Sequence, residues 1–229
     1  MSGDVIAIDG PAGSGKSTVA KALSRRLGYT YIDTGAMYRG MTWLAMHKGI
    51  DLHDEKALTL AAREAEFSFR YEEGEDPPFR VMVNGMDLTR EVRGREVTAR
   101  VSQVSANPSL RKELAKKQRE LASGKNVVME GRDIGTMVFP QARHKFFITA
   151  TVEERARRRC LDLAGEGYVV NEEMVGRELM KRDLLDSSRS ASPFKQAPDA
   201  VVIDTTGMSV EDVVNRIMRV LQAGKPDGG

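Results

Sequence analysis

The sequence predicts an α/β protein built on a doubly wound, parallel sheet of five strands. A short apolar run at residues 5–8 leads into a glycine-rich segment, and an amphipathic helical pattern follows over residues 18–27. Further along, four more short apolar runs alternate with helical stretches. This alternation is typical of parallel sheets that carry helices on both faces.

The elements follow from periodicity and capping residues. Strands are expected over residues 5–8, 29–33, 126–129, 145–149 and 200–204. Asp54 and Asn171 have the positions of helix N-caps, and Thr151 with Glu154 has the spacing of a capping box. Helices are expected over residues 18–27, 34–47, 54–65, 95–107, 109–122, 151–164, 171–186 and 209–223, with Gly165-Glu166-Gly167 breaking the sixth from the seventh.

Residues 67–92 depart from this pattern. Residues 67–71 and 79–83 alternate apolar and polar side chains, with an acidic, proline-containing turn between them. Asn84-Gly85, a dipeptide that favours tight hairpins, comes next. We expect a small antiparallel β insert in a core formed by residues 1–66 and 93–223, with an incidental surface hairpin as the alternative. Residues 224–229 are expected to be a disordered tail.

The segment Gly10-Pro11-Ala12-Gly13-Ser14-Gly15-Lys16-Ser17 matches the phosphate-binding pattern G-x-x-x-x-G-K-[ST]. Glycine lets the backbone approach an anion with its N–H groups pointing inward, and the following helix N-terminus adds partial positive charge. In such a loop Lys16 reaches the β- and γ-phosphates of ATP and the Ser17 hydroxyl ligates Mg²⁺. A nucleoside triphosphate site with Mg²⁺ is therefore predicted, and a glycine-rich turn without a ligand is the alternative.

Composition limits the class of protein. The 229 residues include a single cysteine, Cys160, which excludes an internal disulfide and suits a reducing compartment. No apolar run approaches the roughly 18 residues that span a membrane, and no signal-peptide pattern opens the chain. We expect a soluble cytoplasmic protein. A net charge of +2 argues against nucleic acid bound through a broad basic face.

Arginines recur where a second anionic substrate would need them. Arg39 and Arg132 follow predicted strand ends, the place where open α/β sheets form their ligand crevice. Arg155 and Arg159 lie one helical turn apart beside the glycine break, which suits a short lid over about residues 157–170 that closes on ATP. Two nucleotides that meet phosphate to phosphate need such cations. A solvated surface role is the alternative for each arginine.

Several motifs make the chain resemble bacterial cytidylate kinases, which transfer the γ-phosphoryl group of ATP to CMP or dCMP. The resemblance covers nearly the whole chain, and its most specific segments are Asp33-Thr34-Gly35-Ala36-Met37-Tyr38-Arg39 and Gly131-Arg132-Asp133. The insert at 67–92 matches the enlarged monophosphate-binding domain of that family. Glu130 stands where some members have Asp; we expect this side chain to point away from the substrate, so that the difference has little effect.

The site divides into a donor half and an acceptor half. The donor half comprises residues 10–17 with Thr18, Arg155 and Arg159, and the expected catalytic charges are Lys16, Arg132, Arg159 and Arg182. The resemblance implies that Arg39, Arg132 and Arg182 hold the CMP phosphate, and that Ser102, Arg111 and Asp133 surround the cytosine. It further implies that Thr34 and Tyr38 face the monophosphate, with Asp186 and Arg189 near the sugar. Metal contacts are expected from Ser17 and from Asp33, for which a structural role at the strand end is equally open.

Other functions remain open from the sequence. The closest rival is a kinase of the same fold that phosphorylates another small anionic acceptor, such as another nucleotide or shikimate. A nucleotide-hydrolysing switch is less favoured because the guanine-recognition motif N-K-x-D is absent from the sequence. Few aromatic residues and near-neutral charge argue against a nucleic-acid-dependent ATPase. The resemblance favours a monomer.

Overall fold

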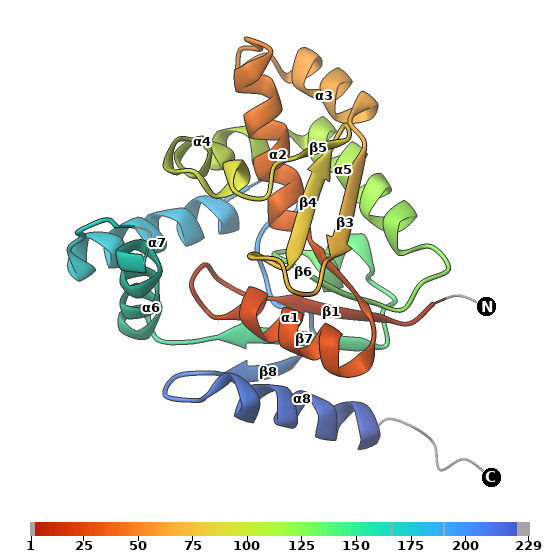
Figure 1. The fold of residues 1–229 in the computed structure, drawn as a ribbon, viewed down its shortest axis with the longest axis vertical. Helices are drawn as coiled ribbons and strands as arrows, with labels where there is room; N and C mark the ends of the chain where they lie inside the picture. The colour runs from red at the N-terminus through yellow and green to blue at the C-terminus, as the bar shows by residue number, and fades with distance from the viewer. Residues whose placement is uncertain (1–2, 166, 190, 224–229) are drawn as a thin grey trace.

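A computed structural model, which describes residues 3–165, 167–189 and 191–223, confirms the predicted α/β fold (Figure 1). Its main sheet has five strands in the order β2-β6-β1-β7-β8, and every pairing is parallel. The strands are β1 (Val5–Asp9), β2 (Thr30–Asp33), β6 (Val127–Gly131), β7 (His144–Thr149) and β8 (Val201–Asp204). The expected tail at 224–229 lies outside the described residues.

The register of the sheet brings the glycine-rich segment and a second turn to one edge. Asp9, the last residue of β1, is opposite Gly131 of β6 and Phe147 of β7. Because these strands are parallel, the segments that follow them leave the sheet at the same edge. The loop that begins at Gly10 therefore starts beside the turn that contains Arg132 and Asp133.

Helices cover both faces of the main sheet (Figure 1). One face packs against α1 (Lys16–Leu27) and α8 (Val210–Ala223), and the opposite face against α5 (Pro108–Ala122) and the short turn η2 (Ile134–Val138). The first interface is formed by Ile6, Ile8, Val19, Leu23, Phe146, Ile148, Ile203, Val213 and Ile217. Burial on both faces explains why the central strands read as continuous apolar runs rather than alternating ones.

The predicted insert is an antiparallel sheet of three strands, β3 (Phe67–Tyr71), β4 (Phe79–Val83) and β5 (Met86–Asp87). The buried side chains of Phe67, Val81 and Val83 share one cluster with α2 (Thr34–His47), α3 (Glu55–Glu64), the turn η1 (Glu91–Arg93), α4 (Arg95–Ser105) and α5. Val83, for example, packs in this cluster with Met41 of α2. The small sheet and these helices therefore form one packed unit above the main sheet (Figure 1). The buried Phe79 instead packs in the cluster that contains Tyr31 of the main sheet.

The helices α6 (Val152–Gly165) and α7 (Glu172–Ser187) form a hairpin beside the main sheet (Figure 1). The predicted capping box of α6 is half right: the Thr151 hydroxyl accepts the Glu154 N–H at 3.3 Å. The reciprocal bond is wrong, since the Glu154 carboxylate instead binds Arg157 and Arg158. Charge-assisted bonds to guanidinium groups are stronger than a bond to a neutral backbone N–H. None of the described helices is long and apolar enough to cross a membrane.

Candidate active site

The glycine-rich segment forms a loop that is open to an anion. A Cβ atom on Gly10 would lie 2.0 Å from the Ile148 carbonyl oxygen, so only glycine allows this close passage over β7. Gly15 is the N-cap of α1 with φ +88°, has no side-chain cap, and is followed by a first turn without acidic residues. The first N–H groups of α1 and the helix dipole can therefore both be used by a phosphate.

Lys16 lies inside this loop, where its Nζ donates to the Pro11 carbonyl at 2.6 Å. Burial and the neighbouring Arg132 lower the pKa of Lys16 from 10.5 to about 7. A phosphate bound in the loop would supply a negative charge and raise this pKa again. Its surroundings thus suit Lys16 to contact an anion.

The predicted metal residue Ser17 is engaged by Glu130. Its hydroxyl donates to Oε2 of Glu130 at 2.9 Å, and the Tyr31 hydroxyl donates to Oε1. The expectation that Glu130 points away from the site is therefore wrong: the strand register of β6 turns this side chain toward the loop. Burial and, secondarily, Asp33 raise the pKa of Glu130.

Asp33 has the structural role that the sequence left open. One carboxylate oxygen accepts the Ala36 N–H at 2.7 Å and caps α2, and the other pairs with Arg39 at 3.0 Å. The described residues contain no group of three or more His, Cys, Asp or Glu side chains suited to a metal. Mg²⁺ in nucleotide sites typically keeps its waters and binds the phosphates with one or two protein groups. Ser17 with Glu130 fits such a site better than Asp33.

The three arginines predicted to bind the CMP phosphate lie together at the edge of the main sheet where β1 and β6 end. They are Arg39, Arg132 and Arg182. Arg132 is held by Asp186, 3.0 Å from its Nε, and by the Gly10 carbonyl, 2.6 Å from its Nη1. Arg182 has neither a hydrogen bond nor an ion pair within the described part of the chain, and its buried Nε is unpartnered. Burial, then Arg132, lowers the pKa of Arg182 to about 10, against the opposing charges of Asp186 and Asp183. The cluster has positive charge that an anion would neutralise.

The residues expected around the base also come together. Nη2 of Arg111 lies 2.6 Å from Oδ2 of Asp133, and both side chains are buried. The Arg111 guanidinium also covers the Tyr38 ring, 5.0 Å from its centroid. Arg111 in addition donates to the Ser105 carbonyl at 3.2 Å. These groups form a compact wall with a carboxylate, a guanidinium and an aromatic face.

Ser105 is a residue that the sequence reasoning missed. Its hydroxyl accepts from Arg189 at 2.8 Å, and Arg189 in turn pairs with the buried Asp186. The predicted Ser102 lies one turn earlier in α4, and its carbonyl accepts the Ser105 hydroxyl at 3.2 Å. The predicted Thr34 donates its hydroxyl to the Glu130 carbonyl at 2.7 Å. The only feature of the sequence that could have indicated Ser105 is its position three residues after Ser102, on the same face of a predicted helix.

Asp9, which the sequence reasoning also missed, holds the turn after β6. Its two carboxylate oxygens accept the N–H groups of Ile134 and Gly135, each at 2.8 Å. These bonds position the turn that contains Arg132 and Asp133. A buried carboxylate at the end of an apolar strand requires hydrogen-bond partners. This requirement could have indicated from the sequence that Asp9 binds another part of the fold.

The α6–α7 hairpin brings further arginines to the loop. Arg155 is buried, pairs with Asp183 and donates to the Ala12 carbonyl at 3.2 Å. Arg158, not predicted, donates to the Ser14 carbonyl at 3.3 Å. Arg159 is half-buried and forms no hydrogen bond or ion pair with other described residues. Thr18 is exposed at the start of α1. Cys160 packs on the hairpin's apolar cluster.

Comparison with known proteins identifies the family. The cytidylate kinase family profile matches residues 6–223. Cytidylate kinase of Geobacillus kaustophilus is 50% identical over 217 residues, which are 94% of this chain and 95% of that protein. The enzyme of Caldanaerobacter subterraneus subsp. tengcongensis is 49% identical over 95% and 94% of the two chains, and that of Pelotomaculum thermopropionicum 48% over 96% of each. The chain belongs to the cytidylate kinase family.

Proposed function

We propose that this protein transfers the γ-phosphoryl group of ATP to CMP or dCMP. The observation that carries the proposal is the environment of Arg182, which lies beside Arg132 and Arg39, has a buried, unpartnered Nε and forms no ion pair with another described residue, although Asp186 and Asp183 lie near it. Such an arrangement favours a bound phosphate monoester, which can accept from several guanidinium groups at once. Its place beside the phosphate loop and the membership in the cytidylate kinase family both support this function.

ATP occupies the donor half in this proposal. The N–H groups of the loop and the first turn of α1 hold its β- and γ-phosphates, and Lys16 contacts the transferred phosphoryl group. Ser17 and Glu130 hold Mg²⁺ on the triphosphate, and the metal supplies charge neutralisation between the phosphates. Arg159, half-buried on the face of α6 that also bears Arg155, is available for the negative charge that develops during transfer.

CMP occupies the acceptor half. Arg39, Arg132 and Arg182 hold its phosphate, and the Arg111–Asp133 pair reads the cytosine edge over the ring of Tyr38. Asp186 and Arg189 lie next to this pair and suit contacts with the sugar and its phosphate, together with Ser102 and Thr34. The parallel register places Gly10 beside Arg132, and this supports neighbouring positions for the donor and acceptor phosphates.

Phosphoryl transfer requires little covalent chemistry from the protein, so orientation and charge neutralisation account for most of the catalysis. Closure of the α6–α7 hairpin, including the lid at 157–170, excludes water that would otherwise hydrolyse ATP. On the opposite side, the unit that contains residues 67–92 closes on CMP. We further propose that the enzyme is cytoplasmic, which its single cysteine supports, and that it is a monomer, which the family resemblance favours.

A comparison of Arg182→Met with Lys181→Met tests this assignment. Lys181 is the exposed neighbour on α7 and serves as the control for loss of one charge. Arg182→Met should raise the KM for CMP about tenfold or more and leave the KM for ATP nearly unchanged, because charged hydrogen bonds contribute about 1.5–3 kcal/mol. Equal changes in the KM for CMP in the two variants would overturn the proposal that the arginine cluster binds the CMP phosphate.

A further inference from the structure

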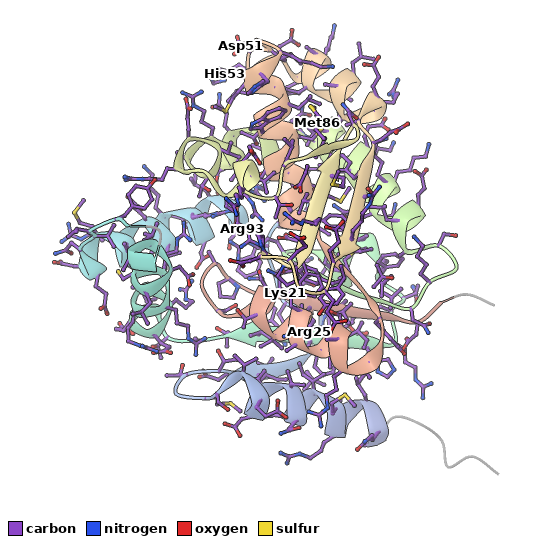
Figure 2. The ribbon with its side chains drawn as sticks, viewed as in Figure 1. Lys21, Arg25, Asp51, His53, Met86 and Arg93 are labelled. Carbon is purple, nitrogen blue, oxygen red and sulfur yellow. The ribbon has the colours of Figure 1, made fainter. Side chains whose placement is uncertain are left out.

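A second cavity lies apart from the phosphate loop, between the end of α1, the start of β2 and the adjacent ends of β3 and β4. Its volume is about 480 Å³, within the range of small-molecule sites. Arg25, which lines it, lies on α1 below the ends of β3 and β4 (Figure 2). The cavity therefore joins the helix of the phosphate loop to the inserted sheet.

Aromatic rings form much of the wall. The Tyr31 and Phe79 rings meet edge to face at 5.0 Å between centroids, and the Tyr71 ring lies 4.9 Å from Phe79 on its other side. Tyr29 and Phe69 complete this wall. Tyr71 is 48% exposed, so part of its surface remains available for a planar ligand. Such a group of rings suits a stacked heterocyclic base.

Positive charge lines the same cavity. Arg25 and Arg70 are exposed, and neither side chain forms a hydrogen bond or ion pair with another residue that the structure describes. The neighbouring arginines, by contrast, have partners. Arg26, next to Arg25, binds Glu211 at 3.0 Å and Asn215 at 2.7 Å, and Arg80, opposite Arg70 on β4, binds Glu75 at 2.7 Å. The two arginines that line the cavity therefore have unpaired charge, Arg25 from α1 and Arg70 from the face of β3 opposite Phe69 and Tyr71.

The edge of the main sheet supplies polar backbone groups. β2 is the first strand in the sheet order, and Thr30 directs its N–H to Asn126 beside β6 at 2.9 Å. Alternate residues of a strand direct their backbone groups to opposite sides. Tyr31 therefore turns its N–H and C=O toward the open edge, where they can meet a donor and an acceptor of a base.

We propose that this cavity binds a nucleoside phosphate, distinct from the two substrates of the catalytic cleft. The base stacks on Tyr71 and Tyr29 and meets the backbone of Tyr31, and the phosphates bind Arg25 and Arg70. A short chain of hydrogen bonds joins the cavity wall to the phosphate loop. The Tyr31 hydroxyl donates to Glu130, which accepts the Ser17 hydroxyl at 2.9 Å.

Equilibrium dialysis with radiolabelled CTP tests this site by counting bound nucleotides per chain. The Arg25→Ala/Arg70→Ala double variant should bind one CTP fewer than the wild type, because both removed arginines line the cavity and neither lies in the catalytic cleft. Arg26→Ala, the matched control on the same helical turn, should bind as many as the wild type. Equal numbers in the wild type and the double variant would overturn the proposal, whatever the kinase activity proves to be.

A second pair of variants distinguishes a nucleotide site from a general anion site. Tyr71→Ala removes the stacking surface and should weaken the additional CTP about tenfold or more, whereas Tyr71→Phe keeps the ring and should retain it. Unchanged binding in Tyr71→Ala would show that only charge matters and would overturn the assignment to a nucleotide. Kinase activity toward CMP in the Arg25→Ala/Arg70→Ala variant should remain that of the wild type, which verifies its folding.

Discussion

Arg111 and Asp133 form a buried ion pair, with 2.6 Å between Nη2 and Oδ2, although they come from α5 and from the turn after β6. The pair offers an acceptor and donors side by side. Cytosine presents the matching set, an amino donor at position 4 beside acceptors at N3 and O2, and a carboxylate is a natural partner for that amino group. Uracil instead has a carbonyl acceptor at position 4 and an N–H donor at N3, so both groups would meet the wrong partner in this pair.

Asp133→Asn should therefore narrow the preference for CMP over UMP, because an amide can donate to the uracil carbonyl. A mismatched buried group costs on the order of 1–3 kcal/mol, so the ratio of kcat/KM values for the two substrates should fall by about tenfold or more. The measurement is kcat/KM for both monophosphates in the wild type and the variant. An equal loss on both substrates would show that Asp133 only orients Arg111 and the turn.

Glu130→Gln should raise the Mg²⁺ concentration needed for half-maximal binding of an ATP analogue, by about tenfold, because the amide has lost the negative charge that attracts the ion. Isothermal titration of the analogue at a series of Mg²⁺ concentrations measures this. Tyr31→Phe is the control, since it removes one hydrogen bond to Glu130 but keeps the carboxylate. The same Mg²⁺ requirement in Glu130→Gln and the wild type would exclude Glu130 from the metal site.

Asp133 and Glu130 illustrate which parts of the fold and the site can be predicted from the sequence. The fold followed from local signals: apolar runs of strand length, helical periodicity, the Asn84-Gly85 hairpin and the phosphate-binding motif. The motif also located Lys16 and Ser17, since their roles depend on fixed spacing within one loop. Asp133 was found through the family resemblance, which assigns a position without requiring knowledge of its partner.

The missed residues act across the fold. Glu130 meets Ser17 only because β6 pairs with β1, and Asp9 reaches Ile134 and Gly135 across the same pair of strands. Arg158 contacts the Ser14 carbonyl only after α6 packs on the loop. No spacing in the sequence encodes these contacts, which arise from strand register and helix placement. The half-wrong capping box has a different, local origin: Arg157 and Arg158 follow Glu154 by three and four residues on the same helix and compete for its carboxylate.

Asp9 predicts a pH dependence of stability. Burial raises its pKa from 3.8 to about 6, against the opposing effect of its two N–H partners. An acid whose pKa is raised on folding stabilises the protein below its unfolded pKa, and this contribution disappears as pH rises through the folded pKa. The free-energy advantage of the wild type over Asp9→Asn should thus shrink by about 2 kcal/mol between about pH 4.5 and about pH 7.5. Urea unfolding at several pH values measures the free energy of unfolding of both proteins. A difference between them that does not change with pH would contradict a raised pKa for Asp9.

Arg159→Ala should lower kcat at least about tenfold, because we place this guanidinium against the charge that develops on the transferred phosphoryl group. Arg157→Ala is the matched control on the same helix, since Arg157 is exposed and pairs with Glu154. Steady-state rates with saturating ATP and CMP distinguish the two. If both variants keep the wild-type kcat, Arg159 has no part in catalysis.

The central claim is that ATP phosphorylates a cytidine monophosphate in this site, and ADP formation with a set of acceptors tests it most directly. The set contains CMP, dCMP, UMP, AMP, GMP and shikimate, with a reaction that lacks an acceptor. The account predicts rapid ADP formation with CMP and dCMP, at least about tenfold less with UMP, and almost none with the purine nucleotides, with shikimate or without an acceptor. ADP formed at the same rate without an acceptor, or preferentially with another acceptor, would contradict it.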